Sequence, residues 1–174
     1  TPLYSSAASD VYKRQARNSV LARPPSQEKD IMSTDKRDEL FERLHHWFGD
    51  SEAANWNEYT TEQVAKGVLH AFTPAQWQRL GETLLSRPEY WQHRCAVSLG
   101  ELRSPPAIEL LKRLLVDSPY LDVRVMAIYE LDWSEAAIEP RYAPCILEIM
   151  DNLSEEGIEP ELQSLLTKAE SAAP

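Results

Sequence analysis

Two stretches of the chain repeat one pattern of residues, and this repetition limits the fold more than any other feature. The segment over residues 87–102 is echoed by the segment over residues 118–131, and Pro88 and Pro119 stand 31 residues apart. A period of this size is typical of a helical solenoid, in which each unit buries its apolar face only against a neighbour. The repetition therefore predicts antiparallel helix pairs that stack in sequence order.

The composition supports the same fold class. The chain has 174 residues, of which 43% are hydrophobic, so it holds enough apolar side chains for the core of one domain. It contains only 5 glycines, and leucine, alanine and glutamate are frequent, which favours helices over strands. We therefore expect a single all-α domain.

The first 31 residues are predicted to stand apart from this domain. Residues 5–15 resemble the in-frame translation of a transposase adaptor used to prepare sequencing libraries, which implies a reading frame from a metagenomic assembly. Residues 16–31 contain adjacent prolines and no sustained apolar period, as in a disordered or untranslated flank. A genuine flexible tail is the alternative. We exclude residues 1–31 from the fold and place the domain over residues 32–174.

Along this domain, apolar residues recur at spacings of three and four, which predicts a series of short helices. Thr73 and Ser104 each precede a proline, the combination of capping hydroxyl and first-turn proline that starts helices. Thr60 or Thr61 is the expected cap of an earlier helix. The clearest repeat units span residues 73–102 and 104–133. Predicted helices cover residues 36–48, 62–71, 90–102, 123–131, 142–153 and 159–169, and two more start at Pro74 and Pro105.

Residues 104–131, which read SPPAIELLKRLLVDSPYLDVRVMAIYEL, resemble a short HEAT-like repeat of the bacterial type. The similarity is fair over residues 73–102 and fades outside residues 73–153. The resemblance implies a short HEAT-like α-solenoid with degenerate helical caps, in which the second helices line the concave side. It also implies that Asp122 and Arg124 tie successive units together. The preceding unit offers Gln92, His93 or Arg94 for this role, with one residue of doubt in the register.

The charge of the chain bears on its partners. The net charge is -10, and because residues 1–31 carry five basic and three acidic side chains, the remainder carries −12. An acidic domain repels phosphate backbones and attracts basic proteins, so we expect a basic protein partner and no direct nucleic-acid binding. Ordinary solubility charge is the alternative explanation.

The cysteines and the hydropathy bear on the compartment. Cys95 and Cys145 are the only cysteines, and both lie in apolar helical surroundings where reduced, buried thiols are expected. No apolar run is long enough to span a bilayer, and no signal-peptide core is present. We therefore expect a cytoplasmic protein that does not bind membranes.

The sequence offers little for catalysis. Glu42 and His45 form one Glu-x-x-His pair, whereas a di-iron bundle needs two such pairs and further carboxylates. HEAT-like metal hydroxylases resemble arrays of His-Glu dipeptides, and no histidine here is followed by glutamate. HEAT-like DNA glycosylases would need a basic groove, but the charge has the opposite sign. We expect no catalytic, cofactor-binding or metal-binding residues, and no enzyme.

Five tryptophans in a small domain suggest a binding surface. Trp47 and Trp77 lie on apolar stripes and are expected in the core, whereas Trp56 lies in a polar loop. Aromatic anchors beside carboxylates suit a basic partner, because aromatics dominate interface energies and carboxylates guide approach. On the second helix of the later unit, Ile128 or Tyr129 is expected to face away from Met126. The predicted partner-binding residues are Tyr129, Asp132, Trp133, Glu135 and Trp91.

Three hypotheses of function follow. The first is an acidic HEAT-like protein that binds and neutralises a basic partner, as bacterial immunity proteins of this kind neutralise toxins. The second is a HEAT-like scaffold or assembly chaperone, similar to relatives that serve chromophore attachment. The third, disfavoured by the absent motifs, is a HEAT-like glycosylase or metal enzyme. The sequence leaves the oligomeric state open.

Overall fold

The computed structural model describes residues 39–154 and 157–172. The adaptor-like segment over residues 5–15, the rest of residues 1–31 and the expected start of the first helix therefore lie outside the described residues. The helices below all belong to the unit that spans Glu39–Pro174.

The described chain is all-α, as the repeat predicts, with a first helix over residues 39–48. The later α-helices are α3 (Glu58–Gly67), α4 (Pro74–Leu84), α5 (Glu89–Leu102), α6 (Pro105–Asp117), α7 (Leu121–Trp133), α8 (Ala143–Asp151) and α9 (Pro160–Ser171). Short 3-10 helices, η1 (Leu69–Ala71) and η2 (Pro140–Tyr142), lie after α3 and before α8.

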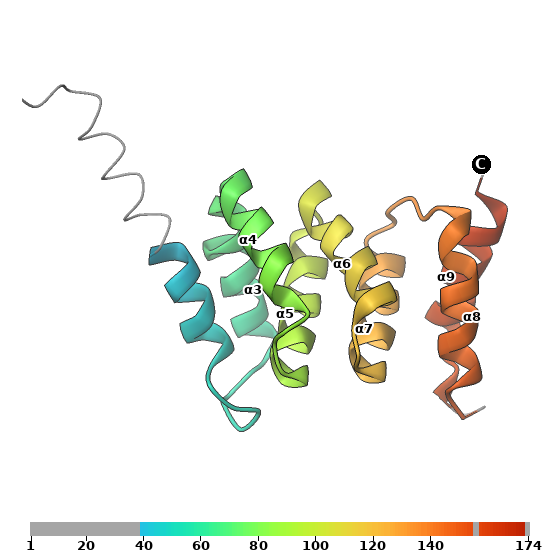
Figure 1. Cartoon of the computed structure of the whole chain (residues 1–174), viewed down its shortest axis with the longest axis horizontal. Helices are drawn as coiled ribbons and strands as arrows, with labels where there is room; N and C mark the ends of the chain where they lie inside the picture. Colours follow the sequence, from blue (N-terminus) through green and yellow to red (C-terminus); the bar gives the residue numbers. More distant parts are fainter. Residues whose placement is uncertain (1–38, 155–156, 173–174) are drawn as a thin grey trace, which may run out of the picture. The chain divides into compact units, whose positions relative to one another are not determined.

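Helices that follow one another along the chain run antiparallel (Figure 1). The helices α3, α5, α7 and α9 lie side by side in that order. α5 contacts α3 on one flank and α7 on the other, and α7 in turn contacts α9. α6 packs against both α5 and α7, and α8 packs against α9. The helices α3, α5, α7 and α9 thus form one layer, and α6 and α8 pack against it.

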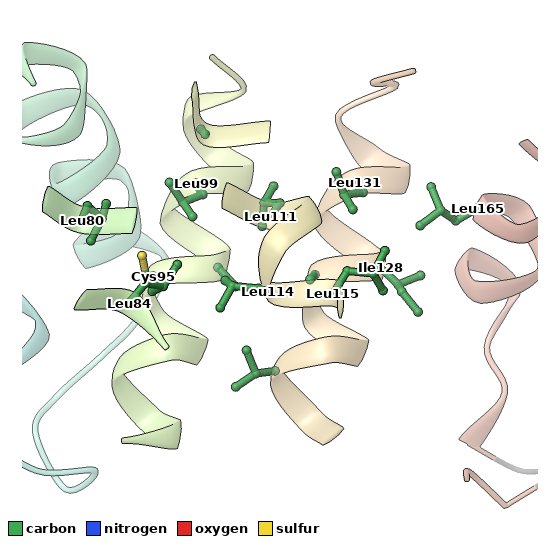
Figure 2. Packing of buried hydrophobic residues seen from close by; sticks show 14 of the residues in the cluster. Leu80, Leu84, Cys95, Leu99, Leu111, Leu114, Leu115, Ile128, Leu131 and Leu165 are labelled. Atoms are coloured by element: carbon green, nitrogen blue, oxygen red, sulfur yellow. The ribbon is translucent and has the colours of Figure 1, made fainter. Parts of the chain in front are cut away.

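One continuous cluster of buried hydrophobic side chains joins these helices. Figure 2 shows Leu99 of α5, Leu114 and Leu115 of α6 and Ile128 of α7 between the ribbons. Full burial of such a side chain contributes about 1.5–3 kcal/mol. Cys95 is a fully buried free thiol whose pKa is raised by that burial, whereas Cys145 is only half-buried. The cluster therefore runs through the repeat units without a break.

Side-chain caps mark the start of α3 and α4, whereas the predicted cap Ser104 makes no capping hydrogen bond at α6, which starts with prolines at its first turn. Thr73 and Gln76 form a reciprocal capping box at α4, as the Thr-Pro pair predicts. The predicted cap of α3 was wrong: Asn57, not Thr60 or Thr61, accepts a hydrogen bond from the Thr60 amide at 3.0 Å. Because asparagine is among the strongest caps, α3 starts four residues earlier than expected.

Polar side chains tie one helix pair to the next. Arg124 of α7 donates through Nε to the Leu115 carbonyl at 3.0 Å, and its guanidinium lies 3.4 Å from the Glu148 carboxylate of α8. Its Nη2 atom is 3.2 Å from the Cys145 sulfur. Arg124 thus joins α6, α7 and α8, as the resemblance implies, whereas Asp122 is exposed and enters no ion pair within the described residues.

Gln92 has the corresponding role in the preceding unit. Its Nε2 atom donates to the carbonyls of Leu85 and Arg87 at 3.2 and 2.8 Å, and its Oε1 atom accepts from the Ser118 hydroxyl at 2.8 Å. Gln92 is completely buried, so these bonds satisfy a polar group that would otherwise be costly. The corner before α5 is thereby fastened to the corner before α7.

We expect Arg124→Ala to lower the free energy of unfolding by about 2 kcal/mol, because it removes a charge-assisted bond to a carbonyl and the link to α8. Urea denaturation followed by circular dichroism measures the change. Arg43→Ala, which removes an exposed arginine from the first helix, is the control and should change stability by less than about 0.5 kcal/mol. Equal effects of the two substitutions would show that Arg124 does not tie the units.

Candidate functional site

The loop between the first helix and α3 is held in place by one buried arginine. The Arg94 side chain of α5 donates to carbonyls 2.9 Å away at Glu52 and Ala54 and 3.3 Å away at Ser51, and it also bonds to the Phe48 carbonyl. These bonds occupy carbonyls at the end of the first helix and in the loop, which lack helical partners. A single side chain thus fixes the path of residues 49–54.

The same guanidinium lies between two aromatic rings. Its central carbon is 5.5 Å from the centre of the Trp56 ring and 5.1 Å from that of Tyr90. Both distances suit cation–π attraction. Arg94 therefore positions Trp56, which the loop carries, above α5.

Two adjoining hollows open over α5 between the loop, α3 and α7. The first, of about 770 Å³, lies towards the start of α5, and the second, of about 610 Å³, lies towards its end. Trp56 and His93 line both hollows, so the two form a continuous depression. We call this depression the acidic groove. The second hollow, towards the end of α5, is called the lower hollow.

Carboxylates dominate the lining of the acidic groove. Its basic side chains are Arg94, whose guanidinium is engaged by the loop carbonyls, and Arg103. The seven carboxylates are Glu52, Glu58, Glu62, Glu89, Glu101, Asp122 and Glu130. Clefts lined by one sign of charge concentrate partners of the opposite sign, so the groove attracts cations.

Aromatic rings line the same depression. Trp56 comes from the loop and Tyr90 from α5. Tyr120 lies just before α7, and Trp133 lies at its end. Trp133 keeps 54% of its surface exposed. The Tyr129 ring stacks on it with centres 6.1 Å apart and planes at 25°. The groove therefore offers aromatic surface beside its carboxylates.

The structure separates the predicted partner-binding residues. Trp133 lines the lower hollow, and Tyr129 supports it. Burial, with a hydrogen bond to Glu159, raises the pKa of Tyr129 to about 12. Glu135 is exposed in the corner after α7, where its φ of 54° is left-handed.

Two of the predicted residues, Trp91 and Asp132, do not lie on a free surface. Trp91 is 3% exposed and packs edge-on against Phe48, with ring centres 4.6 Å apart, so it is a core residue. Asp132 accepts a 2.7 Å hydrogen bond from Ser164 and pairs with Lys168 at 2.7 Å, so it fastens α7 to α9. Both are corrections to the prediction.

The expected orientation of α7 also needs correction. Ile128, one alternative for the outward face, is fully buried, whereas Tyr129 is half-buried. Met126, expected inside, is half-buried and lines the first hollow. The role of α5 as the floor of the groove was not predicted from the sequence. Its outward residues Glu89, His93, Val97 and Glu101 follow a four-residue spacing, and this stripe was the available signal.

Glu130 of α7 is the most unusual member of the groove. It is 9% exposed, and its carboxylate lies over Gly100 of α5, where a Cβ atom would stand only 2.7 Å from the Glu130 Cβ. Burial raises the pKa of Glu130 to about 7, against an opposing effect of Arg103. Glycine at position 100 is thus required for the close contact of α5 with α7.

The described residues were compared with what a metal site and a membrane-spanning helix require. No group of three or more histidine, cysteine, aspartate or glutamate side chains there is arranged to hold a metal ion. None of the described helices combines the length and apolar character needed to cross a membrane. The acidic groove, with its carboxylates and aromatic rings, is the candidate site.

Comparison with known proteins identifies a segment of the chain. Residues 91–117 match the PBS lyase HEAT-like repeat. The chain contains a HEAT-like repeat. The matched segment covers most of α5 and α6, which form the floor of the groove and the helix behind it. Repeats of this type suggest protein binding. No curated protein and no solved structure matches the chain significantly.

We expect Gly100→Ala to lower the free energy of unfolding by about 2 kcal/mol, because the added methyl overlaps the Glu130 side chain and forces α5 and α7 apart. Thermal or urea denaturation measures the loss. Gly67→Ala, at the end of α3, is the control: its methyl meets nothing within 4 Å, and we expect a gain of about 0.5 kcal/mol. A gain for both variants would contradict the close contact.

We expect Glu130→Gln to stabilise the protein above pH 7 and to have little effect below pH 4.5. The folded protein retains the Glu130 proton up to about pH 7, whereas the unfolded chain releases it near 4.5. Ionisation of this group therefore opposes folding increasingly as the pH rises through that window. Thermal unfolding of both proteins should give melting temperatures that diverge by several degrees between pH 5 and pH 8. Parallel curves would contradict the buried carboxyl.

Proposed function

We propose that the chain is a protein-binding module that takes a basic segment of a partner protein into the acidic groove. The observation that carries this proposal is the imbalance of charge in the groove: seven carboxylates face two guanidinium groups, both of which already bond to backbone carbonyls. Lys66 pairs with two of the carboxylates, Glu62 and Glu101, and the other five have no ion-pair partner among the described residues. The HEAT-like repeat under the groove supports protein binding in general. A basic partner is the more specific element of the proposal.

Shape and charge support a segment of chain as the occupant. The two hollows follow α5 along its length and expose aromatic rings between the carboxylates. Aromatic rings contribute much of the binding energy at protein interfaces, and unpaired carboxylates speed the approach of a cationic partner. A second copy of this chain is disfavoured as occupant because each copy carries a net charge of -10.

The finer proposal is that binding neutralises the partner, as in an immunity protein. Its support is the acidity of the chain and of the groove, since the matched repeat itself gives none. Co-expression with the product of a neighbouring gene should then restore growth that this product alone prevents. If the pair binds without any loss of the partner's activity, the scaffold hypothesis replaces neutralisation. That the chain binds without catalysing a reaction stays a prediction.

The groove is tested with a fluorescein-labelled peptide of alternating arginine and serine and the full chain at low salt. We expect the triple variant Glu52→Lys, Glu58→Lys, Asp122→Lys to bind the peptide at least about tenfold more weakly, because three groove charges are reversed. Fluorescence anisotropy measures the affinity.

The matched control is Glu82→Lys, Asp151→Lys, Glu170→Lys, which changes the net charge equally at exposed positions outside the groove. Its affinity should fall by less than about threefold, through long-range charge alone. Equal losses in the two triple variants would mean that the peptide senses only the net charge, and the groove proposal would be wrong. It would also be wrong if the wild-type chain sedimented as a dimer and the groove triple variant as a monomer.

A further inference from the structure

Glu130 differs from the other buried charged side chains of the described unit because it has no partner of its own. Arg94 bonds to loop carbonyls, and Lys112 pairs with Glu139 at 2.9 Å. Within the described residues, no hydrogen bond or ion pair engages the Glu130 carboxylate, although more than nine-tenths of the residue is buried. Arg103 acts on it only at longer range, and its Nε donates instead to the Gly100 carbonyl at 3.2 Å.

The unpaired carboxylate opens into the lower hollow. Glu130 and Gly100 both line this hollow, and the absence of a side chain at Gly100 lets the Glu130 carboxylate lie against the backbone of α5 at the edge of the hollow. Burial of a carboxylate without a counter-charge is unfavourable, and a cation brought into contact offsets that cost. The Glu130 carboxylate is therefore placed to form an ion pair with a cation that enters the lower hollow.

The walls of the lower hollow suit the rest of a cationic side chain. Trp133 and Trp56 provide aromatic faces, and Val97 provides an aliphatic one. Lysine and arginine carry long apolar stems that pack on such surfaces, and their charged ends are attracted to aromatic faces and to carboxylates. Stacking by Tyr129 holds Trp133 in place before a partner arrives.

We propose that the lower hollow is a subsite for one lysine or arginine side chain of the partner, whose cation pairs with the Glu130 carboxylate. The inference rests on the proposed function and makes it specific: the groove does not merely attract basic proteins but anchors one cationic side chain at the contact between α5 and α7. Glu58 beside the hollow adds to the attraction, whereas Glu62 and Glu101 are partly offset by their ion pairs with Lys66.

Insertion of the cation should release a proton. Near pH 7 the Glu130 carboxyl is partly protonated, because burial raises its pKa to about 7, and an adjacent cation favours the ionised form. Of the other groups around it, Arg103 stays charged, and burial holds the pKa of His93 below its usual value, so His93 is already largely neutral at pH 7. Binding at pH 7 should therefore expel a proton from Glu130.

The test measures binding of the same labelled arginine–serine peptide to the full chain at pH 7. We expect Glu130→Gln to weaken binding about tenfold, because the charged acceptor is lost while shape is kept. Glu82→Gln, on α4, removes an equal charge outside the groove and should leave the affinity within about twofold. Calorimetry in two buffers of different ionisation enthalpy should detect proton release by the wild-type chain and none by Glu130→Gln.

The outcomes separate this inference from the proposed function. If the wild-type chain binds the peptide and the triple groove variant does not, but Glu130→Gln retains full affinity and the same proton release, the subsite is overturned and the groove stands. If the wild-type chain fails to bind the peptide, the proposed function fails with it. A peptide in which citrulline replaces arginine should bind the wild type and Glu130→Gln equally weakly; a preference for the wild type would contradict pairing with a cation.

Discussion

The burial of α5 between α3 and α7 is the constraint on which the described unit depends. Eight of its fourteen residues are buried, among them Cys95, Leu99 and Gly100. A helix held on both flanks and covered by α6 keeps only a narrow stripe for solvent. That stripe becomes the floor of the acidic groove, because α3 and α7 rise on either side of it. The core and the candidate binding surface are thus opposite faces of one helix.

Much of the architecture could be predicted from local sequence. The 31-residue echo predicts stacked helix pairs, and Thr73 and Arg124 do what their local patterns imply. The error at Trp91 was avoidable: Trp91, Cys95 and Leu99 are spaced by four along α5, which places the tryptophan on the buried stripe rather than at an exposed helix start.

The groove itself was beyond local reasoning. Its outer wall depends on Arg94, which reaches carbonyls forty or more positions earlier in the chain. Likewise, Asp132 has the acidic character of a binding residue, and only its contact with Lys168 on α9 shows that its charge is already used. Composition counts charges, whereas recognition depends on which charges remain unpaired after folding. Glu130 is the clearest case, since its environment is defined by a glycine on another helix.

The attachment of the loop to Arg94 has a consequence for how the groove responds to acid. Most buried cations in proteins are matched to carboxylates, and such pairs weaken when the carboxylates take up protons. The partners of Arg94 are neutral carbonyl oxygens, which do not titrate. Acidification can therefore neutralise the carboxylates that line the groove while the bonds of Arg94 keep the loop in place. The shape of this surface and its electrostatic potential are thus separable properties of the molecule.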